Sequence, residues 1–248
     1  MVLTALRGAV GFFTRIPVGR DATAWEALRT SPSSVVAIGY LVGALLALPF
    51  LVPAPAPVVA FAYLAWVVAV TGIAHADGLA DLGDAAVVHG SPPARRRVMR
   101  DTTVGVGGVV AVVLVVAGLL LAAWALAGVP LRIAIGIVVA SEVGAKVAMA
   151  TLACLGHPSH RGMAAGLIGP ATVGDVPATL AVALPAMVLT WPSPAAAASV
   201  LAGVVVALAL WRTAGRWLGG VSGDVLGAAN ELGRVLALHV GVIAWTLS

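Results

Sequence analysis

The sequence predicts an all-α protein, a polytopic bundle of about six to seven transmembrane helices that forms a single integral membrane domain over residues 1–248. Hydrophobic residues make up 61% of the chain and charged residues only 10%, whereas soluble domains carry about 25% charged residues. Several charge-free runs reach the roughly 20 residues that a helix needs to cross a bilayer. The mean hydropathy of +1.07 agrees with a protein that lies in a membrane.

The first twenty residues are predicted to form an amphipathic helix at the membrane interface, because Phe12 and Phe13 lie next to a basic residue. Their spacing alone favours an anchoring role. Arg15 follows the two aromatic rings and lies close to the polar face, so it could instead contact a substrate phosphate. No apolar stretch ending in a cleavage site is present here, so we expect no removed signal peptide.

Prolines and charged residues divide the rest of the chain into apolar segments. Residues 30–76 contain no Asp, Glu, Lys or Arg and are split by three prolines, which predicts a transmembrane hairpin. Residues 102–155 form a second hairpin around a Gly-Val-Pro turn, and a third apolar pair ends near Trp211. The last segment, 235–247, is short and spans only if its helix begins further back, within residues 224–234.

The charges fall almost entirely on one side of this topology. Of the fourteen Lys and Arg residues, Arg132 falls on the opposite face and Lys146 inside a helix, which leaves twelve on the side of the N-terminus. The positive-inside rule therefore predicts a plasma-membrane protein whose polar loops face the cytoplasm. Topology also accounts for the pI near 10.2, and because no clustered basic face is present we expect no nucleic-acid partner.

Three aspartates follow the second apolar segment directly, and we expect them to continue its helix. Asp77, Asp81 and Asp84 stand at i, i+4 and i+7, so they share one helical face. Like charges at that spacing repel, and a divalent cation relieves the repulsion. Carboxylate oxygens suit Mg²⁺ or Mn²⁺, and Mg²⁺ commonly completes its shell with substrate phosphate. A solvated helix end is the alternative, but ionisable groups next to a membrane helix favour a functional site.

Four arginines and an aspartate follow in the same loop, at Arg95, Arg96, Arg97, Arg100 and Asp101. The arginines could serve topology alone, or they could neutralise phosphoryl groups beside the aspartates. Asp101 could complete the metal shell or accept a proton. The sequence leaves these roles open.

A second polar motif lies far along the chain, at residues 219–224. Its glycine-rich turn could expose backbone N–H groups to an anion, but it lacks the Lys-Ser/Thr ending of a Walker loop. Asn230 and Glu231 follow it. The predicted topology puts this motif on the same side as Asp77, so the two could meet at one site.

Glu142 and Lys146 lie four residues apart inside the fourth predicted span. This order favours a helix ion pair, and a buried structural pair is the favoured interpretation. Charges within the membrane also mark transport paths, so the pair is the main support for a transporter as an alternative function. The clustering of the other charges on one face argues against transport.

Several separated motifs occur in order along the whole chain, at Phe12–Val18 (FFTRIPV), His75–Asp84 (HADGLADLGD), Arg100–Gly108 (RDTTVGVGG) and Gly219–Ala228 (GGVSGDVLGA), with Glu231 after the last. On these motifs the chain resembles the adenosylcobinamide-GDP ribazoletransferase family, also called cobalamin synthases. It departs from the family pattern at Thr102 and Thr103, where Ser and a basic residue are common. The aspartate motif also faintly resembles that of CDP-alcohol phosphotransferases, which leaves a lipid phosphotransferase as a second enzymatic alternative.

The resemblance implies a Mg²⁺-dependent transfer that joins adenosylcobinamide-GDP to α-ribazole, or to its 5′-phosphate, and releases GMP. The products would be adenosylcobalamin or its 5′-phosphate, and homo-oligomerisation is left open. The roles implied are metal binding and catalysis for Asp77, Asp81, Asp84 and Asp224, catalysis for Asp101, and substrate binding for Arg15, His75, Arg100, Ser222, Asn230 and Glu231.

Overall fold

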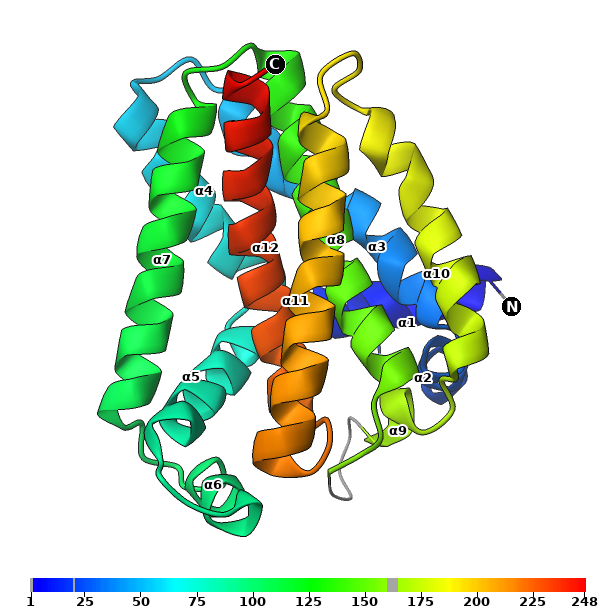
Figure 1. Ribbon diagram of the computed structural model, residues 1–248. Coiled ribbons are helices and arrows are strands. Elements are labelled where there is room, and N and C mark those ends of the chain that lie inside the picture. Colours follow the sequence, from blue (N-terminus) through cyan, green and yellow to red (C-terminus); the bar gives the residue numbers. More distant parts are fainter. Residues whose placement is uncertain (1, 20, 160–164) are drawn as a thin grey trace.

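The structure is a computed structural model that describes residues 2–19, 21–159 and 165–248 (Figure 1). Within these residues the chain forms helices and no β-strand. The α-helices are α1 (Val2–Phe13), α2 (Ala22–Arg29), α3 (Pro32–Leu46), α4 (Ala56–Thr71), α5 (Ala74–Val87), α6 (Pro92–Val98), α7 (Val106–Leu126), α8 (Leu131–Leu155), α9 (Ala165–Ile168), α10 (Val176–Ala183), α11 (Ala195–Leu218) and α12 (Gly223–Thr246). Short 3₁₀ helices occupy Leu48–Leu51, Val173–Asp175 and Leu184–Val188.

Within the described part of the chain, five helices are long and apolar enough to cross a membrane: α3 together with the following 3₁₀ turn, α7, α8, α11 and α12. The pair α4 and α5 would make a sixth span if it is counted as one broken helix, and a shorter apolar helix covers Val173–Val188. The predicted all-α membrane bundle is confirmed. The last span is complete because α12 begins at Gly223, well before the apolar segment seen in the sequence.

The expectation that the aspartates continue the second apolar helix is wrong. Helix α4 ends at Thr71, and α5 begins at Ala74 after a bend of 100°. Gly72 causes the break, because its φ of +74° lies in a region that other residues rarely adopt. Helix α5 therefore leaves the direction of α4 and lies across one end of the bundle.

This end of the bundle carries α5, α6 and the start of α12, whereas the C-terminus and the turn between α7 and α8 lie at the other end (Figure 1). We call it the polar end. Helix α8 forms the core between the two ends and packs against α3, α11 and α12. Of the residues in its most apolar stretch, 94% are buried. Two residues of the predicted polar loop, His160 and Arg161, lie outside the described residues.

Helix α1 is amphipathic, as predicted, and packs against α2 and α3. Ala5, Ala9 and Phe13 are buried at intervals of four residues, whereas Val2 and Leu3 are exposed. The buried stripe leads directly to Phe13, whose ring lies close to the start of α5. The N-terminal helix is thus attached to the bundle at the polar end.

Candidate active site

The two separated motifs meet where α5 crosses α12. A Cβ atom added at Gly78 would lie 2.7 Å from the Cα atom of Asp224, so the two helix backbones are in direct contact there. Only a residue without a side chain allows this approach. The crossing confirms the expectation that the aspartate motif and the glycine-rich motif meet.

The carboxylates at this crossing influence each other's charge. The pKa of Asp81 is raised to about 6, first because the side chain is partly buried and then because Asp224, Asp77 and Asp84 lie near it. The exposure of the three aspartates of α5 decreases along the helix: Asp77 is exposed, Asp81 is partly buried and Asp84 is buried. Their mutual repulsion is the electrostatic condition that a bound cation would relieve.

Asp84 has a structural role that the sequence does not reveal. Its Oδ2 atom accepts a hydrogen bond of 2.7 Å from the Gly105 N–H, and its Oδ1 atom accepts one of 2.8 Å from the Gly108 N–H. Because the first N–H groups of a helix lack partners and carry partial positive charge, a carboxylate is stabilised at this position. Asp84 therefore fixes the start of α7 to α5. The donors lie 21 and 24 residues away, so no local pattern predicts the contact.

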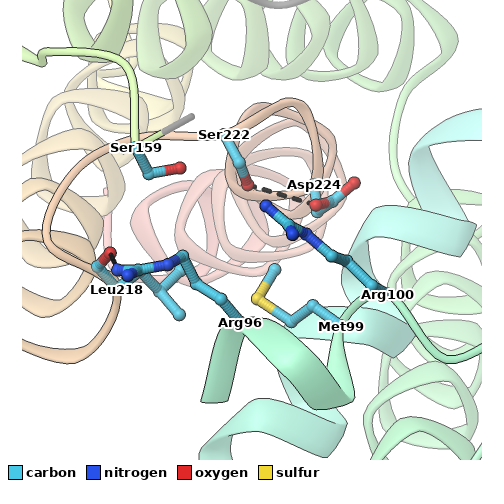
Figure 2. A pocket seen from close by; sticks show the side chains of 7 residues that line it. All are labelled: Arg96, Met99, Arg100, Ser159, Leu218, Ser222 and Asp224. Atoms are coloured by element: carbon cyan, nitrogen blue, oxygen red, sulfur yellow. Dashed lines mark hydrogen bonds between the residues drawn. The ribbon is translucent and has the colours of Figure 1, made fainter. Parts of the chain in front are cut away.

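A pocket opens beside Asp224, and Figure 2 shows that its walls come from distant parts of the chain. The Ser222 hydroxyl donates a hydrogen bond of 3.2 Å to the Asp224 Oδ2 atom, and the same hydroxyl caps the first turn of α12. The guanidinium group of Arg100 points toward these two residues (Figure 2). We call this the carboxylate pocket, and its lining is Arg96, Met99, Arg100, Ser159, Leu218, Ser222 and Asp224.

Two arginines attach α6 to the rest of the polar end. The Arg95 Nη1 atom donates to the carbonyl of Ala85 at the end of α5, and its guanidinium group lies 4.8 Å from the centre of the Trp217 ring. The Arg96 Nη1 atom donates to the carbonyl of Leu218 at the end of α11. These contacts hold α6 between α5 and α11.

Asp101 lies outside the carboxylate pocket, in the turn before α7. Its Oδ1 atom accepts hydrogen bonds from the Thr103 N–H at 3.1 Å and from the Thr103 hydroxyl at 2.8 Å. These bonds hold the pKa of this exposed carboxyl below its usual range. The structure therefore shows a turn-stabilising contact for Asp101, and its predicted catalytic role stays a prediction.

The N-terminal motif lies at the bend between α4 and α5. The Arg15 N–H donates a hydrogen bond of 2.8 Å to the carbonyl of Val70, and the Arg15 side chain lies over Gly72. The rings of Phe13 and His75 are 5.9 Å apart. Arg15 is exposed and close to the start of the aspartate helix, which is compatible with the predicted phosphate contact.

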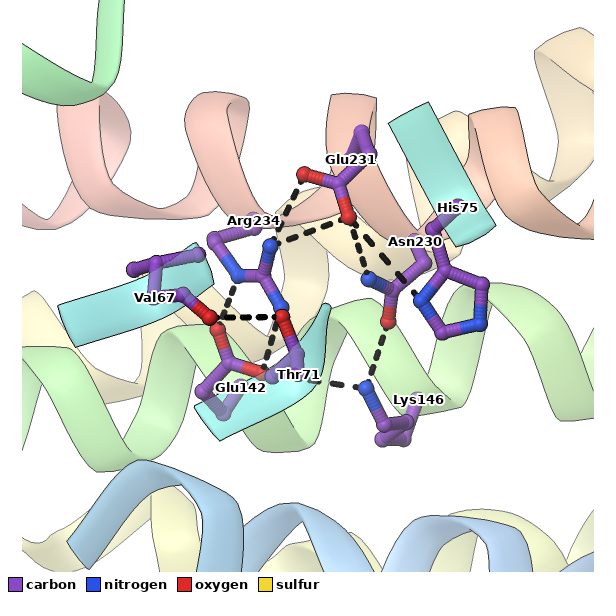
Figure 3. A network of polar contacts seen from close by, with 8 residues as sticks. All are labelled: Val67, Thr71, His75, Glu142, Lys146, Asn230, Glu231 and Arg234. Carbon is purple, nitrogen blue, oxygen red and sulfur yellow. Dashed lines mark hydrogen bonds and ion pairs between the residues drawn. The ribbon is translucent and has the colours of Figure 1, made fainter. Parts of the chain in front are cut away.

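A buried ionic network lies directly behind the site (Figure 3). Arg234 donates hydrogen bonds to both carboxylates, Glu142 from α8 and Glu231 from its own helix. Lys146 lies 3.7 Å from Glu142 and donates to the side-chain carbonyl of Asn230. Two carboxylates and two cations give no net charge, which makes burial tolerable. The buried structural pair expected from the sequence is confirmed, and Arg234 is the partner that the sequence analysis missed.

Two of the predicted substrate-binding residues, Asn230 and Glu231, belong to this network. Asn230 is fully buried and its amide donates 2.9 Å to Glu231, so it lies in the interior. Glu231 is 7% exposed, and its Oε1 atom lies 4.0 Å from the Nδ1 atom of His75. His75 and Glu231 thus connect the network with the aspartate helix. The neutral network also removes the main argument for a transporter, because Glu142 and Lys146 already have partners.

The donor set fits a divalent cation without forming a complete cage. Within residues 2–19, 21–159 and 165–248, no three His, Cys, Asp or Glu side chains converge closely enough to hold a metal ion. Mg²⁺ does not require such convergence, since it is commonly bound by one or two carboxylates together with waters and substrate phosphates. The carboxylates of Asp77, Asp81 and Asp224 supply the oxygen ligands that it prefers.

Comparison with known proteins identifies the family of the chain over nearly its whole length. The family model described as cobalamin-5-phosphate synthase matches residues 5–242. The adenosylcobinamide-GDP ribazoletransferase of Halorubrum lacusprofundi is 55% identical over 99% of both chains, and that of Haloquadratum walsbyi is 44% identical over 100% of both chains. The enzyme of the same name from Halobacterium salinarum is 56% identical over 78% of this chain and 97% of its own. No solved structure matches significantly. The chain belongs to the cobalamin-5-phosphate synthase family.

Proposed function

We propose that this protein is a transferase of cobalamin nucleotide-loop assembly, which joins adenosylcobinamide-GDP to α-ribazole or α-ribazole 5′-phosphate and releases GMP. The observation that carries the proposal is the contact between Gly78 and Asp224, which unites the two polar motifs in a member of this family. The adenosylcobinamide-GDP ribazoletransferases of two relatives match the chain over nearly its full length.

The reaction replaces a phosphoanhydride bond of the donor by a phosphodiester bond. A ribazole hydroxyl oxygen forms a bond to the phosphorus that is attached to cobinamide, and the bond from that phosphorus to GMP breaks. The proton of the hydroxyl is lost to a base, and GMP leaves with the bonding electron pair. Positioning and charge stabilisation dominate such transfers. Arg100 and Arg15 are proposed to orient the phosphates from the two sides of the aspartate helix.

Mg²⁺ is proposed as the cofactor, held by one or two of the carboxylates of Asp77, Asp81 and Asp224 together with waters and substrate phosphate. When bound, it would neutralise negative charge that develops on the phosphate oxygens. Asp84 stays a predicted ligand, because each of its oxygens accepts one backbone N–H and keeps a second lone pair. We propose that the protein lies in the plasma membrane and that its polar end faces the cytoplasm, because nearly all basic residues lie on that side in the predicted topology.

The test is turnover by the full-length protein in nanodiscs. Adenosylcobinamide-GDP and α-ribazole should give adenosylcobalamin and GMP with Mg²⁺, EDTA should stop the reaction, and added Mg²⁺ should restore it. Asp77→Asn and Asp81→Asn should each lower kcat by about 100-fold or more. Glu26→Gln, at an exposed residue of α2, is the control and should keep wild-type activity. Full activity in both aspartate variants would refute the proposed metal site. Failure of the folded protein to make a cobamide would refute the proposed function.

A further inference from the structure

A second pocket adjoins the carboxylate pocket and is lined by Pro93, Arg96, Arg97 and Arg100. We call it the arginine pocket. Arg96 and Arg100 line both pockets, so the two cavities are neighbours with a common wall. The carboxylate pocket contains the carboxylate of Asp224, whereas the arginine pocket is lined only by cationic and apolar side chains.

The arginines of this pocket differ in how they are used. Arg96 is held by the carbonyl of Leu218, and the neighbouring Arg95 is held by the end of α5. Arg97 and Arg100 are exposed, and within the described part of the chain no hydrogen bond or ion pair involves their side chains. They stand three residues apart at the end of α6, where their like charges repel. A bound anion would relieve that repulsion.

The charge of the arginine pocket favours a phosphate monoester as its ligand. Guanidinium groups bind phosphate through paired N–H donors, and two exposed arginines match a doubly charged group. In the proposed reaction, the 5′-phosphate of the acceptor is such a group, and it does not react. It is carried on the same ribose as the attacking hydroxyl, so its binding site must lie within a few ångströms of the reacting centre. Two pockets with a common wall satisfy this requirement.

We propose that the arginine pocket binds the 5′-phosphate of α-ribazole 5′-phosphate, and that Arg97 thereby makes the phosphorylated acceptor the preferred substrate. The inference rests on the proposed function. It adds a specificity-determining residue and a binding site for a part of the substrate that takes no part in the chemistry. Arg100, at the common wall, would contact both this phosphate and the reacting one.

The test compares the two acceptors with full-length protein in nanodiscs. In Arg97→Gln, the KM for α-ribazole 5′-phosphate should rise about tenfold, the loss of one charge-assisted contact, whereas the KM for α-ribazole should move less than about twofold. Arg216→Gln is the matched control, because Arg216 is an exposed arginine at the end of α11 that lines neither pocket. It should leave both KM values unchanged.

Four results would overturn the inference. Equal changes for both acceptors, or no change for either, would mean that Arg97 does not recognise the 5′-phosphate. A rise confined to the KM for adenosylcobinamide-GDP would assign the pocket to the donor. An effect seen only in nanodiscs with anionic lipid, and equal for both acceptors, would assign it to lipid headgroups.

A binding measurement separates this inference from the proposed function. Calorimetric titration with each acceptor, in the absence of donor, should show that Arg97→Gln weakens the binding of α-ribazole 5′-phosphate about tenfold and spares α-ribazole. This comparison needs no turnover, so it decides the role of Arg97 even if the protein makes no cobamide. Equal binding of the phosphorylated acceptor by the variant and the wild type would refute the inference.

Discussion

Arg234 is the cation on which the buried network depends, and its removal is the sharpest test of the fold. The side chain is fully buried and contacts Glu142 through two hydrogen bonds and Glu231 through two more. In Arg234→Gln, two carboxylates would remain in the interior with Lys146 as their only cation. We therefore expect a large loss of stability.

The magnitude follows from what removal of one partner does to a buried ion pair. Such a change costs about 3–5 kcal/mol, because the remaining charge keeps its desolvation penalty. For a chain of this length, each kcal/mol corresponds to about 2–4 °C in Tm, so Arg234→Gln should lower Tm by roughly 10 °C. The assay is thermal unfolding in nanodiscs, followed by the fluorescence of the seven tryptophans.

A double variant supplies the control. In Arg234→Gln combined with Glu142→Gln, one charge of each sign is removed, and Lys146 and Glu231 remain to balance each other. The double variant should lose less stability than the two single losses added together, because the partners are coupled. A Tm within about 2 °C of the wild type for Arg234→Gln, or strict additivity in the double variant, would refute the coupled network.

Two further predictions concern the contacts of α5. Asp84→Asn keeps the shape of the side chain but replaces one acceptor oxygen by a donor that faces a backbone N–H of α7, so stability should fall by about 1–3 kcal/mol, measured as a lower Tm. An unchanged Tm would show that Asp84 does not fix the start of α7. Gly78→Ala puts a methyl group against the backbone of Asp224 and should lower kcat by separating α5 from α12, whereas Gly215→Ala, with nothing within 4 Å, should leave kcat unchanged. Equal kcat values in these two glycine variants would contradict the close crossing.

The sequence was sufficient for those parts of the fold that depend on composition and periodicity. Charge-free runs predicted the hairpins, and the distribution of arginines predicted one polar end. The predicted topology put the motifs around Asp77 and Asp224 on the same side of the membrane, because two apolar hairpins were predicted between them, so the two motifs could meet. These features need no knowledge of which helix packs against which.

Features that depend on helix register could not be predicted. Arg234 reaches Glu142 across 92 residues, and this pairing exists only once α8 and α12 pack at a particular rotation. The bend at Gly72 depends on a positive φ, which a single glycine in an apolar run does not reveal. The orientation of Asp84 toward α7 likewise depends on donors from another helix. In each case the sequence supplied the residue and tertiary packing supplied its partner.

The interior and the polar end balance charge in different ways, and His75 connects them. In the interior, Arg234 and Lys146 balance two carboxylates, so the network is stable without a ligand. At the polar end, burial and then the neighbouring carboxylates raise the pKa of Asp81, and the proposed cation would relieve the repulsion among these carboxylates. His75 lies 4.0 Å from Glu231 and only two residues before Asp77, so the network contacts the first turn of α5. A network variant that stays folded should therefore lower kcat, because it displaces the carboxylates that the reaction uses.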